Sequence, residues 1–141
     1  MTSIVSKPLY ARLSRQAGTR CGYCRTSLQV IGQPLTVEHI IPRALGGSSH
    51  EDNLWLSCRR CNEFKGAQVE ATDPETGLSV PLFDPRRQSW RDHFVWSGDG
   101  MLMIGLTPSG RATIAALQIN NFDIVSARQL WVAAGWHPPQ E

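Results

Sequence analysis

Four cysteines are the residues of this sequence whose type and spacing point most directly to chemistry. They form two C-x2-C pairs, Cys21/Cys24 and Cys58/Cys61, which account for every cysteine in the chain. A C-x2-C turn presents two thiolates to one tetrahedral zinc ion, and two such turns complete a four-cysteine site. Four unrelated buried thiols or a redox pair are the alternatives. Two matched pairs with no thiol left over favour structural zinc.

The 33 residues between the pairs exceed the usual zinc-ribbon spacing, and they contain Glu38 and His39 side by side in the run TVEHIIP. A hydrophobic core has no use for an adjacent carboxylate and imidazole. Metal-assisted hydrolysis of a phosphodiester can use both groups, because this reaction needs a base that activates water and a cation that stabilises the developing charge. His39 suits the base, since its intrinsic pKa is near neutral. Glu38 is a hard oxygen donor suited to magnesium.

Two asparagines extend this set. Asn62, just past the second cysteine pair, offers an amide oxygen to a cation, and Asn53 is a neutral amide able to hold the imidazole or its loop. Each polar residue alone would be interpreted as a surface group or a turn former, whereas their joint presence in this order favours a site. Neighbours on a regular strand point to opposite faces, so Glu38 and His39 share a site only where the strand bends or ends. Pro42 is compatible with such an end.

Periodicity and breaker residues predict the elements that must position these groups. In the first half we expect a helix over Lys7–Gln16, a hairpin over Ser27–Val37, an extended stretch over Asn53–Leu56 and a helix capped by Ser57 that runs from Cys58 to Lys65. In the second half we expect a hairpin around Ser97–Gly100, a helix from Thr107-Pro108 to about Asn120, and a helix capped by Asp123 and closed by Gly135, with Val125, Leu130 and Val132 inward.

The ordered pattern EHI-x-P, GG, NL and C-x2-CN-x2-K, bracketed by a first C-x2-C, closely resembles the HNH endonucleases with a ββα-metal core, in their His-Asn-Asn variant. The resemblance covers about Arg20–Gly66. Its motifs are specific because the separate pieces occur in order and interleave with the cysteine pairs. It implies an α+β fold, in which a ββα-metal core with structural zinc is followed by a C-terminal β-hairpin and two helices.

The resemblance also implies a metal-dependent nuclease that hydrolyses DNA phosphodiesters to a 5′-phosphate and a 3′-hydroxyl. His39 would be the general base, Asn53 the positioning residue, and Glu38 and Asn62 the ligands of a catalytic Mg²⁺ or Mn²⁺ ion distinct from the zinc. Asp is also common where Glu38 stands, which alters the expected metal preference. Asn62 replaces the His often found there, so a softer metal such as zinc should bind the catalytic position less readily.

Charge is uneven along the chain. Residues 1–65 hold nine Lys or Arg and four Asp or Glu, a net charge of +5, whereas residues 66–141 carry −3. A basic first half fits a polyanion such as double-stranded DNA, with a solvated basic face as the alternative. The residues expected to contact phosphates are Lys65, Arg43, Arg59 and Arg60, and a solvated helix face is an equal alternative for Arg59 and Arg60. A homodimer is one way in which a single site per chain could cut both strands.

We expect three regions: a nuclease core over 1–67 with an N-terminal helix and the zinc site, a connection over 68–80, and an α+β extension over 81–141 packed on the core. The motifs PLFDPR, HF-x-W, GLTP-x-GRATI and W-x3-GWHPP resemble the C-terminal extension of many small stand-alone bacterial HNH proteins. A helical cover for the sheet is the role expected for this extension, with substrate selection as the alternative.

Composition also limits where the protein acts. No apolar run approaches the ~20 residues that span a bilayer. The N-terminus lacks the charged start and apolar block of a secretory signal. We therefore expect a cytoplasmic protein with reduced cysteines and no membrane partner.

Two other functions compete with the nuclease. A non-catalytic zinc module that binds nucleic acid would keep the cysteines and the basic residues, but it has no use for Glu38, His39 and Asn62. A thiol redox protein would need reactive, metal-free cysteines. The joint presence of the three polar residues favours the enzyme.

Overall fold

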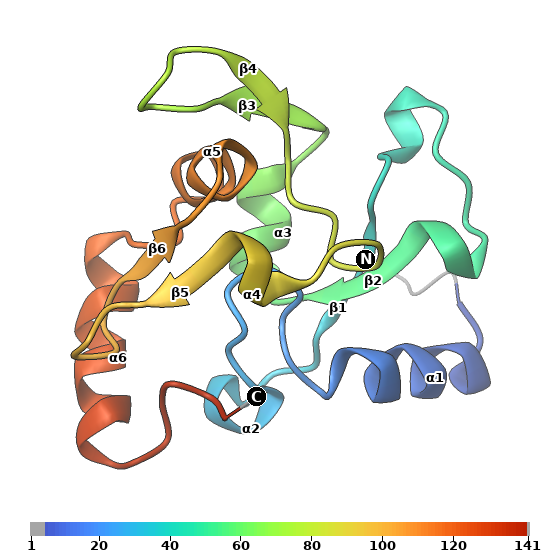
Figure 1. Cartoon of the computed structure of the whole chain (residues 1–141). Coiled ribbons are helices and arrows are strands. Elements are labelled where there is room, and N and C mark those ends of the chain that lie inside the picture. Colours follow the sequence, from blue (N-terminus) through green and yellow to red (C-terminus); the bar gives the residue numbers. More distant parts are fainter. Residues whose placement is uncertain (1–4, 141) are drawn as a thin grey trace. The chain divides into compact units, whose positions relative to one another are not determined.

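The computed structural model describes residues 5–140, and Figure 1 traces the elements along the chain. Contacts divide the chain into two units. The first unit holds the described residues up to Val69 together with Asp84–Arg87, and the second holds Glu70–Phe83 and the described residues from Gln88 on. The short segment Asp84–Arg87 thus belongs with residues far from it in sequence.

The first unit carries the predicted site. Its elements in chain order are α1 (Lys7–Ala17), α2 (Leu28–Ile31), β1 (Thr36–His39), the 3-10 turns η1 (Arg43–Leu45) and η2 (Glu51–Asn53), β2 (Leu54–Ser57) and α3 (Arg59–Lys65). Strands β1 and β2 pair antiparallel, with His39 opposite Leu54 and Glu38 opposite Trp55. Together with α3 they form the ββα arrangement expected from the sequence.

Local sequence explains where these elements start and stop. Ser6 caps α1 by accepting a hydrogen bond from the Leu9 amide at 3.2 Å, and Gly18 ends the helix in the left-handed conformation. Leu13 on this helix is fully buried. The helix predicted over Lys7–Gln16 is therefore confirmed, one residue longer at its end.

The core of the first unit lies under β2. Leu54 and Leu56 alternate along the strand and are completely buried, as is Leu13 of α1. Alternation places these two leucines on the face shared with Val37 and His39 and leaves Trp55 on the other face with Glu38. One face of the hairpin therefore carries the buried leucines and, at the end of β1, the His39 side chain, and the other face receives the Glu38 side chain.

The second unit contains two hairpins and three helices among the described residues. Its elements are β3 (Glu70–Thr72), β4 (Ser79–Pro81), α4 (Trp90–His93), β5 (Phe94–Trp96), β6 (Met103–Gly105), α5 (Pro108–Ala116) and α6 (Phe122–Ala133). The pairs β3–β4 and β5–β6 are both antiparallel. Thr107 caps α5 with Pro108 in the first turn, as predicted.

Several local predictions were wrong. The stretch predicted as a hairpin over Ser27–Val37 begins instead with helix α2, because the Ser27 hydroxyl caps it and Gly32 closes it. The residues 68–80, predicted as a connection, form the hairpin β3–β4. On α6 the N-cap is Asn121 rather than Asp123, and Leu130 is exposed while Arg128 is buried.

The fold class is confirmed: the described residues form an α+β structure with a ββα core, although two hairpins and three helices follow this core rather than the one hairpin and two helices expected. Among the described residues no helix is long and apolar enough to cross a membrane. The assignment of 1–67 as a nuclease core and 81–141 as an extension packed on it stays a prediction.

Candidate active site and zinc centre

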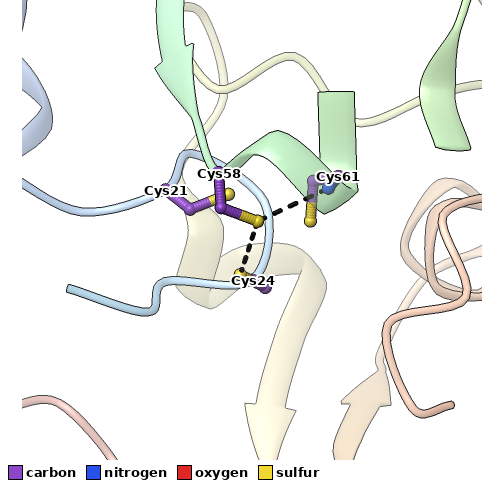
Figure 2. Close-up of side chains that lie close together, drawn as sticks. All are labelled: Cys21, Cys24, Cys58 and Cys61. Atoms are coloured by element: carbon purple, nitrogen blue, oxygen red, sulfur yellow. Dashed lines mark hydrogen bonds between the residues drawn. The ribbon is translucent and has the colours of Figure 1, made fainter. Parts of the chain in front are cut away.

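The four cysteines meet at one point in the first unit. All four are buried, and their sulfur atoms lie within 4.8 Å of one another. Figure 2 shows them converging from the turn before α2 and from the start of α3, with Cys24 Sγ at 3.7 Å from Cys58 Sγ. Zinc–sulfur bonds of about 2.3 Å in a tetrahedron put neighbouring sulfur atoms about 3.8 Å apart. The cluster therefore has the spacing that a zinc ion requires.

Backbone geometry prepares each cysteine pair for a metal. The Arg25 amide donates to the Cys21 carbonyl at 3.1 Å and closes the first turn, with Arg25 itself at a positive φ of 63°. In the second pair Cys58, not Ser57 as predicted, caps α3: its sulfur accepts from the Cys61 amide at 3.4 Å. Amide groups aimed at sulfur stabilise the thiolate form, which is the form that binds zinc.

The pKa shifts of the cysteine thiols are also consistent with a metal site. Burial, followed by contact with the other thiols, raises the pKa of Cys21 well above its ordinary value, whereas hydrogen bonds from the other three cysteines hold that of Cys24 well below. Burial thus opposes ionisation of Cys21, and contacts among the sulfur atoms favour the thiolate of Cys24. Four buried thiolates need a cation, and the donor set fits Zn²⁺.

Cys58→Ser should lower bound zinc below one ion per chain and lower the melting temperature, because a structural zinc ion contributes directly to folding. Elemental analysis and thermal unfolding measure both effects. Ser57→Ala is the matched control: the Ser57 hydroxyl is buried without a hydrogen-bond partner among the described residues, and this variant should keep its zinc. Unchanged zinc content and melting in Cys58→Ser would remove the zinc assignment.

His39 is the last residue of β1, and its imidazole is partly exposed. Its Nε2 atom lies 3.1 Å from the Ser49 hydroxyl, which holds the ring in one orientation. Partial burial, followed by the positive charges of Arg43 and Lys65, lowers the pKa of His39 below its ordinary value. The imidazole is therefore neutral at neutral pH and able to accept a proton.

Asn53 closes the loop that follows β1. Its Oδ1 atom accepts from the Ile41 amide at 2.9 Å, and its Nδ2 group donates to the carbonyls of Ile41 at 3.0 Å and Ser48 at 2.8 Å. Gly47 lies against the Ile41 carbonyl so closely that a Cβ atom would overlap it. The side chain thus ties both ends of the loop that presents Ser49 to His39, and the positioning role of Asn53 in catalysis stays a prediction.

Asn53→Asp should destabilise this loop and lower any activity of His39, because a carboxylate keeps the shape but loses both N–H donors and faces two carbonyl oxygens. We expect a loss of about 1–3 kcal/mol per carbonyl left without its donor. Chemical denaturation measures it. Asn121→Asp makes the same change at the partly exposed N-cap of α6, where the capping oxygen is kept and only one donor, to the Gln118 carbonyl, is lost. A loss no larger than in this control would contradict the role of Asn53.

Glu38 lies on the opposite face of β1 from His39. Its side chain is 2% exposed, with Oε1 at 3.2 Å from the Lys65 ammonium and Oε2 accepting a hydrogen bond from the Tyr23 hydroxyl. Burial raises the pKa of Glu38, and the charge of Lys65 and the hydrogen bond of Tyr23 act against this. The strand stays regular through both residues, so alternation separates them. In this arrangement Glu38 does not fit the predicted role of cation ligand.

Lys65 is equally buried and does not fit its predicted role in DNA binding. Its side chain is 2% exposed, and besides Glu38 it contacts the carbonyls of His39 at 3.3 Å and Ile40 at 3.0 Å. An ammonium group held by three acceptors inside the protein cannot reach a phosphate. The prediction was wrong because position in α3 does not tell which face of the helix meets the strand.

Lys65→Met should destabilise the protein by about 3–5 kcal/mol, because it leaves the Glu38 carboxylate buried without its counter-charge. The double variant Glu38→Gln/Lys65→Met should regain part of this loss. Denaturant unfolding measures all three proteins, with Lys7→Met, at an exposed position, as the control. Equal stability of Lys65→Met and wild type would show that the pair is not a stabilising one.

The remaining predicted residues lie around α3 and the loop. Asn62 is partly exposed, and its side chain makes no hydrogen bond within the described part of the chain. Arg43 is exposed, and Arg59 is exposed and paired with Glu63 at 3.0 Å. Arg60 is partly buried; burial alone would lower its pKa, but the negative potential of the cysteine cluster outweighs this and raises it.

Three residues of the site were missed from the sequence. Tyr23 lies inside the first C-x2-C turn, where an aromatic residue signals packing rather than a contact with Glu38. Ser49 belongs to a polar loop and carries no motif of its own. Gly47 could have been recognised from the sequence, because the GG pair of the motif is typical of a place where two backbone segments approach closely.

Comparison with known proteins bears on the first unit. Residues 21–73 match a family model described as HNH endonuclease. The matched segment contains both cysteine pairs, Glu38, His39, Asn53 and Asn62. A search of curated proteins found no significant match, and neither did a search of solved structures. The family match confirms the resemblance stated from the sequence.

Proposed function

We propose, from the HNH endonuclease segment over residues 21–73, that this protein is a DNA endonuclease with His39 as its general base. The observation that carries the proposal is the position of the His39 imidazole, partly exposed at the end of β1 next to a loop that Asn53 ties at both ends, and its lowered pKa favours the neutral form. A base that must accept a proton from water needs this protonation state and this access to solvent.

The reaction proposed is hydrolysis of a DNA phosphodiester. His39 accepts a proton from a water molecule, whose oxygen attacks phosphorus in line with the bond to the 3′ oxygen. That bond breaks, and the leaving oxygen takes a proton from solvent. The products are a 5′-phosphate and a 3′-hydroxyl. Ser49 and Asn53 keep the imidazole and its loop in place during these steps.

A divalent cation, Mg²⁺ or Mn²⁺, is proposed as cofactor on the family resemblance, and when bound it would supply positive charge to the phosphate. Asn62 offers a free amide oxygen for it. Glu38 does not, because Lys65 and Tyr23 occupy its carboxylate oxygens. The described side chains therefore form an incomplete ligand set for this ion.

Substrate binding is proposed to rest on exposed cations. Arg43 lies just beyond His39 on the same loop, and Arg59 lies on α3. Both are exposed and can contact DNA phosphates, Arg59 after release from Glu63, with Arg60 contributing through its charge. Double-stranded DNA is the proposed substrate, and a homodimer remains the proposed route to cutting both strands.

His39→Ala should lower cleavage of supercoiled plasmid by about 100-fold or more, because proton transfer by a positioned base contributes at least that much. Wild-type cleavage should need Mg²⁺ or Mn²⁺, stop with EDTA and return when the cation is restored, with zinc content measured in parallel. His50→Ala, which removes an exposed histidine from the same loop, is the matched control and should cut like wild type.

Equal cleavage by His39→Ala and wild type would refute the proposal that His39 is the general base. If neither protein cuts but both retard the plasmid in a gel, the non-catalytic zinc module becomes the better description. The ratio of nicked to linear product reports whether one or two strands are cut per encounter.

A further inference from the structure

The segment Asp84–Arg87 lies outside the matched HNH region, yet it belongs to the first unit. It forms a compact turn: Asp84 Oδ1 accepts from the amides of Arg86 at 3.0 Å and Arg87 at 3.2 Å. Arg87 Nη1 also pairs with Asp84 Oδ2 at 3.1 Å. The turn thereby presents two neighbouring guanidinium groups with defined directions.

These guanidinium groups bind one backbone carbonyl in β2 and one in the turn η2 that precedes it. Arg86 donates to the Leu54 carbonyl through Nε at 3.1 Å and Nη2 at 2.9 Å, and Arg87 donates to the Asp52 carbonyl at 2.8 Å. The next carbonyl in the series, that of Leu56, accepts from the Gly22 amide at 2.9 Å. Alternate carbonyls of an extended chain point to the same side, so the donors to Leu54 and Leu56 satisfy the free edge of β2, while Arg87 holds the carbonyl of Asp52 in η2, just before the strand.

Arg86 is fixed by more than its hydrogen bonds. Its guanidinium lies 5.0 Å from the centre of the Trp55 ring, and Nη2 also donates to Gln16 at 2.9 Å. The neighbouring Pro85 packs so near the first cysteine turn that a Cβ atom on Gly22 would lie 2.9 Å from its ring. The segment Asp84–Arg87 thus contacts the turn between Cys21 and Cys24, helix α1 and strand β2.

The two carbonyls that it holds flank the site. Asp52 and Leu54 stand on either side of Asn53, and Leu54 is the direct cross-strand partner of His39. The Asn53 carbonyl in turn accepts from the Ile40 amide at 2.9 Å, next to His39. Arg86 and Arg87 therefore hold the backbone of Asn53 from both sides, while the Asn53 side chain holds the loop.

We propose that Arg86 and Arg87 are positioning residues of the nuclease site, supplied from outside the matched HNH region, which fix Asn53 and through it His39 and its loop. The proposal rests on the proposed function for its kinetic part only. Its structural part concerns the order of the loop and stands apart from cleavage.

The experiment compares Arg86→Ala, Arg87→Ala and Arg86→Lys with wild type. Arg91→Ala is the matched control, since Arg91 is exposed on α4 and removes the same charge from the second unit. Amide hydrogen exchange is measured at Ile40 and Ile41, whose amides donate to Asn53. Plasmid cleavage gives kcat and KM, and DNA affinity is measured at several salt concentrations. All assays run below the melting temperature of each variant.

The expected result is faster exchange at both amides and a kcat lowered about 10- to 100-fold with KM and DNA affinity unchanged, as a small displacement of a catalytic group predicts. Arg86→Lys should recover part of both effects because its ammonium group can still donate to the Leu54 carbonyl, although it cannot form the two-nitrogen contact of the guanidinium. Arg87→Ala, at an exposed position, keeps the test open if Arg86→Ala does not fold.

Unchanged exchange in both alanine variants would overturn the proposal. So would a loss of DNA affinity with a salt slope reduced by about one, since that identifies a phosphate contact instead. If wild type cuts no DNA at all, the proposed function fails, but the exchange measurement still decides whether the two arginines order the loop.

Discussion

Four buried thiols within 4.8 Å of one another set the constraint on which the first unit depends. A hairpin with four residues in each strand has too little core to stand alone, and the cysteines join it to the turn before α2 and to α3. Brought so close and away from water, the thiols can all ionise only around a cation. The cluster therefore suggests a zinc site, and a zinc ion bound there would couple metal binding to the folding of this unit.

Tyr23, which lies between Cys21 and Cys24, connects the first cysteine turn to the strand that bears His39. The Tyr23 hydroxyl and the Lys65 ammonium close on Glu38 from two sides, and Lys65 also holds the carbonyls of His39 and Ile40. One face of β1 is thus occupied by a buried ionic cluster. The other face carries the imidazole. The two adjacent residues therefore differ in role: Glu38 makes buried contacts with Lys65 and Tyr23, whereas His39 is partly exposed to solvent.

Prediction from sequence succeeded where neighbours in the chain decide the outcome. The α1 helix with its Gly18 stop, the β5–β6 hairpin and the Thr107 cap all follow from residues a few positions apart. It failed for α2, where a serine cap outweighed the strand pattern, and for Leu130 on α6, where the buried position belongs to Arg128. Which side of a helix is covered depends on partners distant in sequence.

By itself the sequence identified the four cysteines that converge in the structure and the asparagine that holds the loop, and it predicts His39 as the base, because residue type and short spacing limit what such groups can do. Only the tertiary structure decided that Glu38 and Lys65 face each other inside the protein and that Arg86 and Arg87 bind the carbonyls of Leu54 and Asp52. The physical reason is that strand alternation and helix rotation fix the direction of a side chain. The groups it then meets lie 27 or more than 30 residues away.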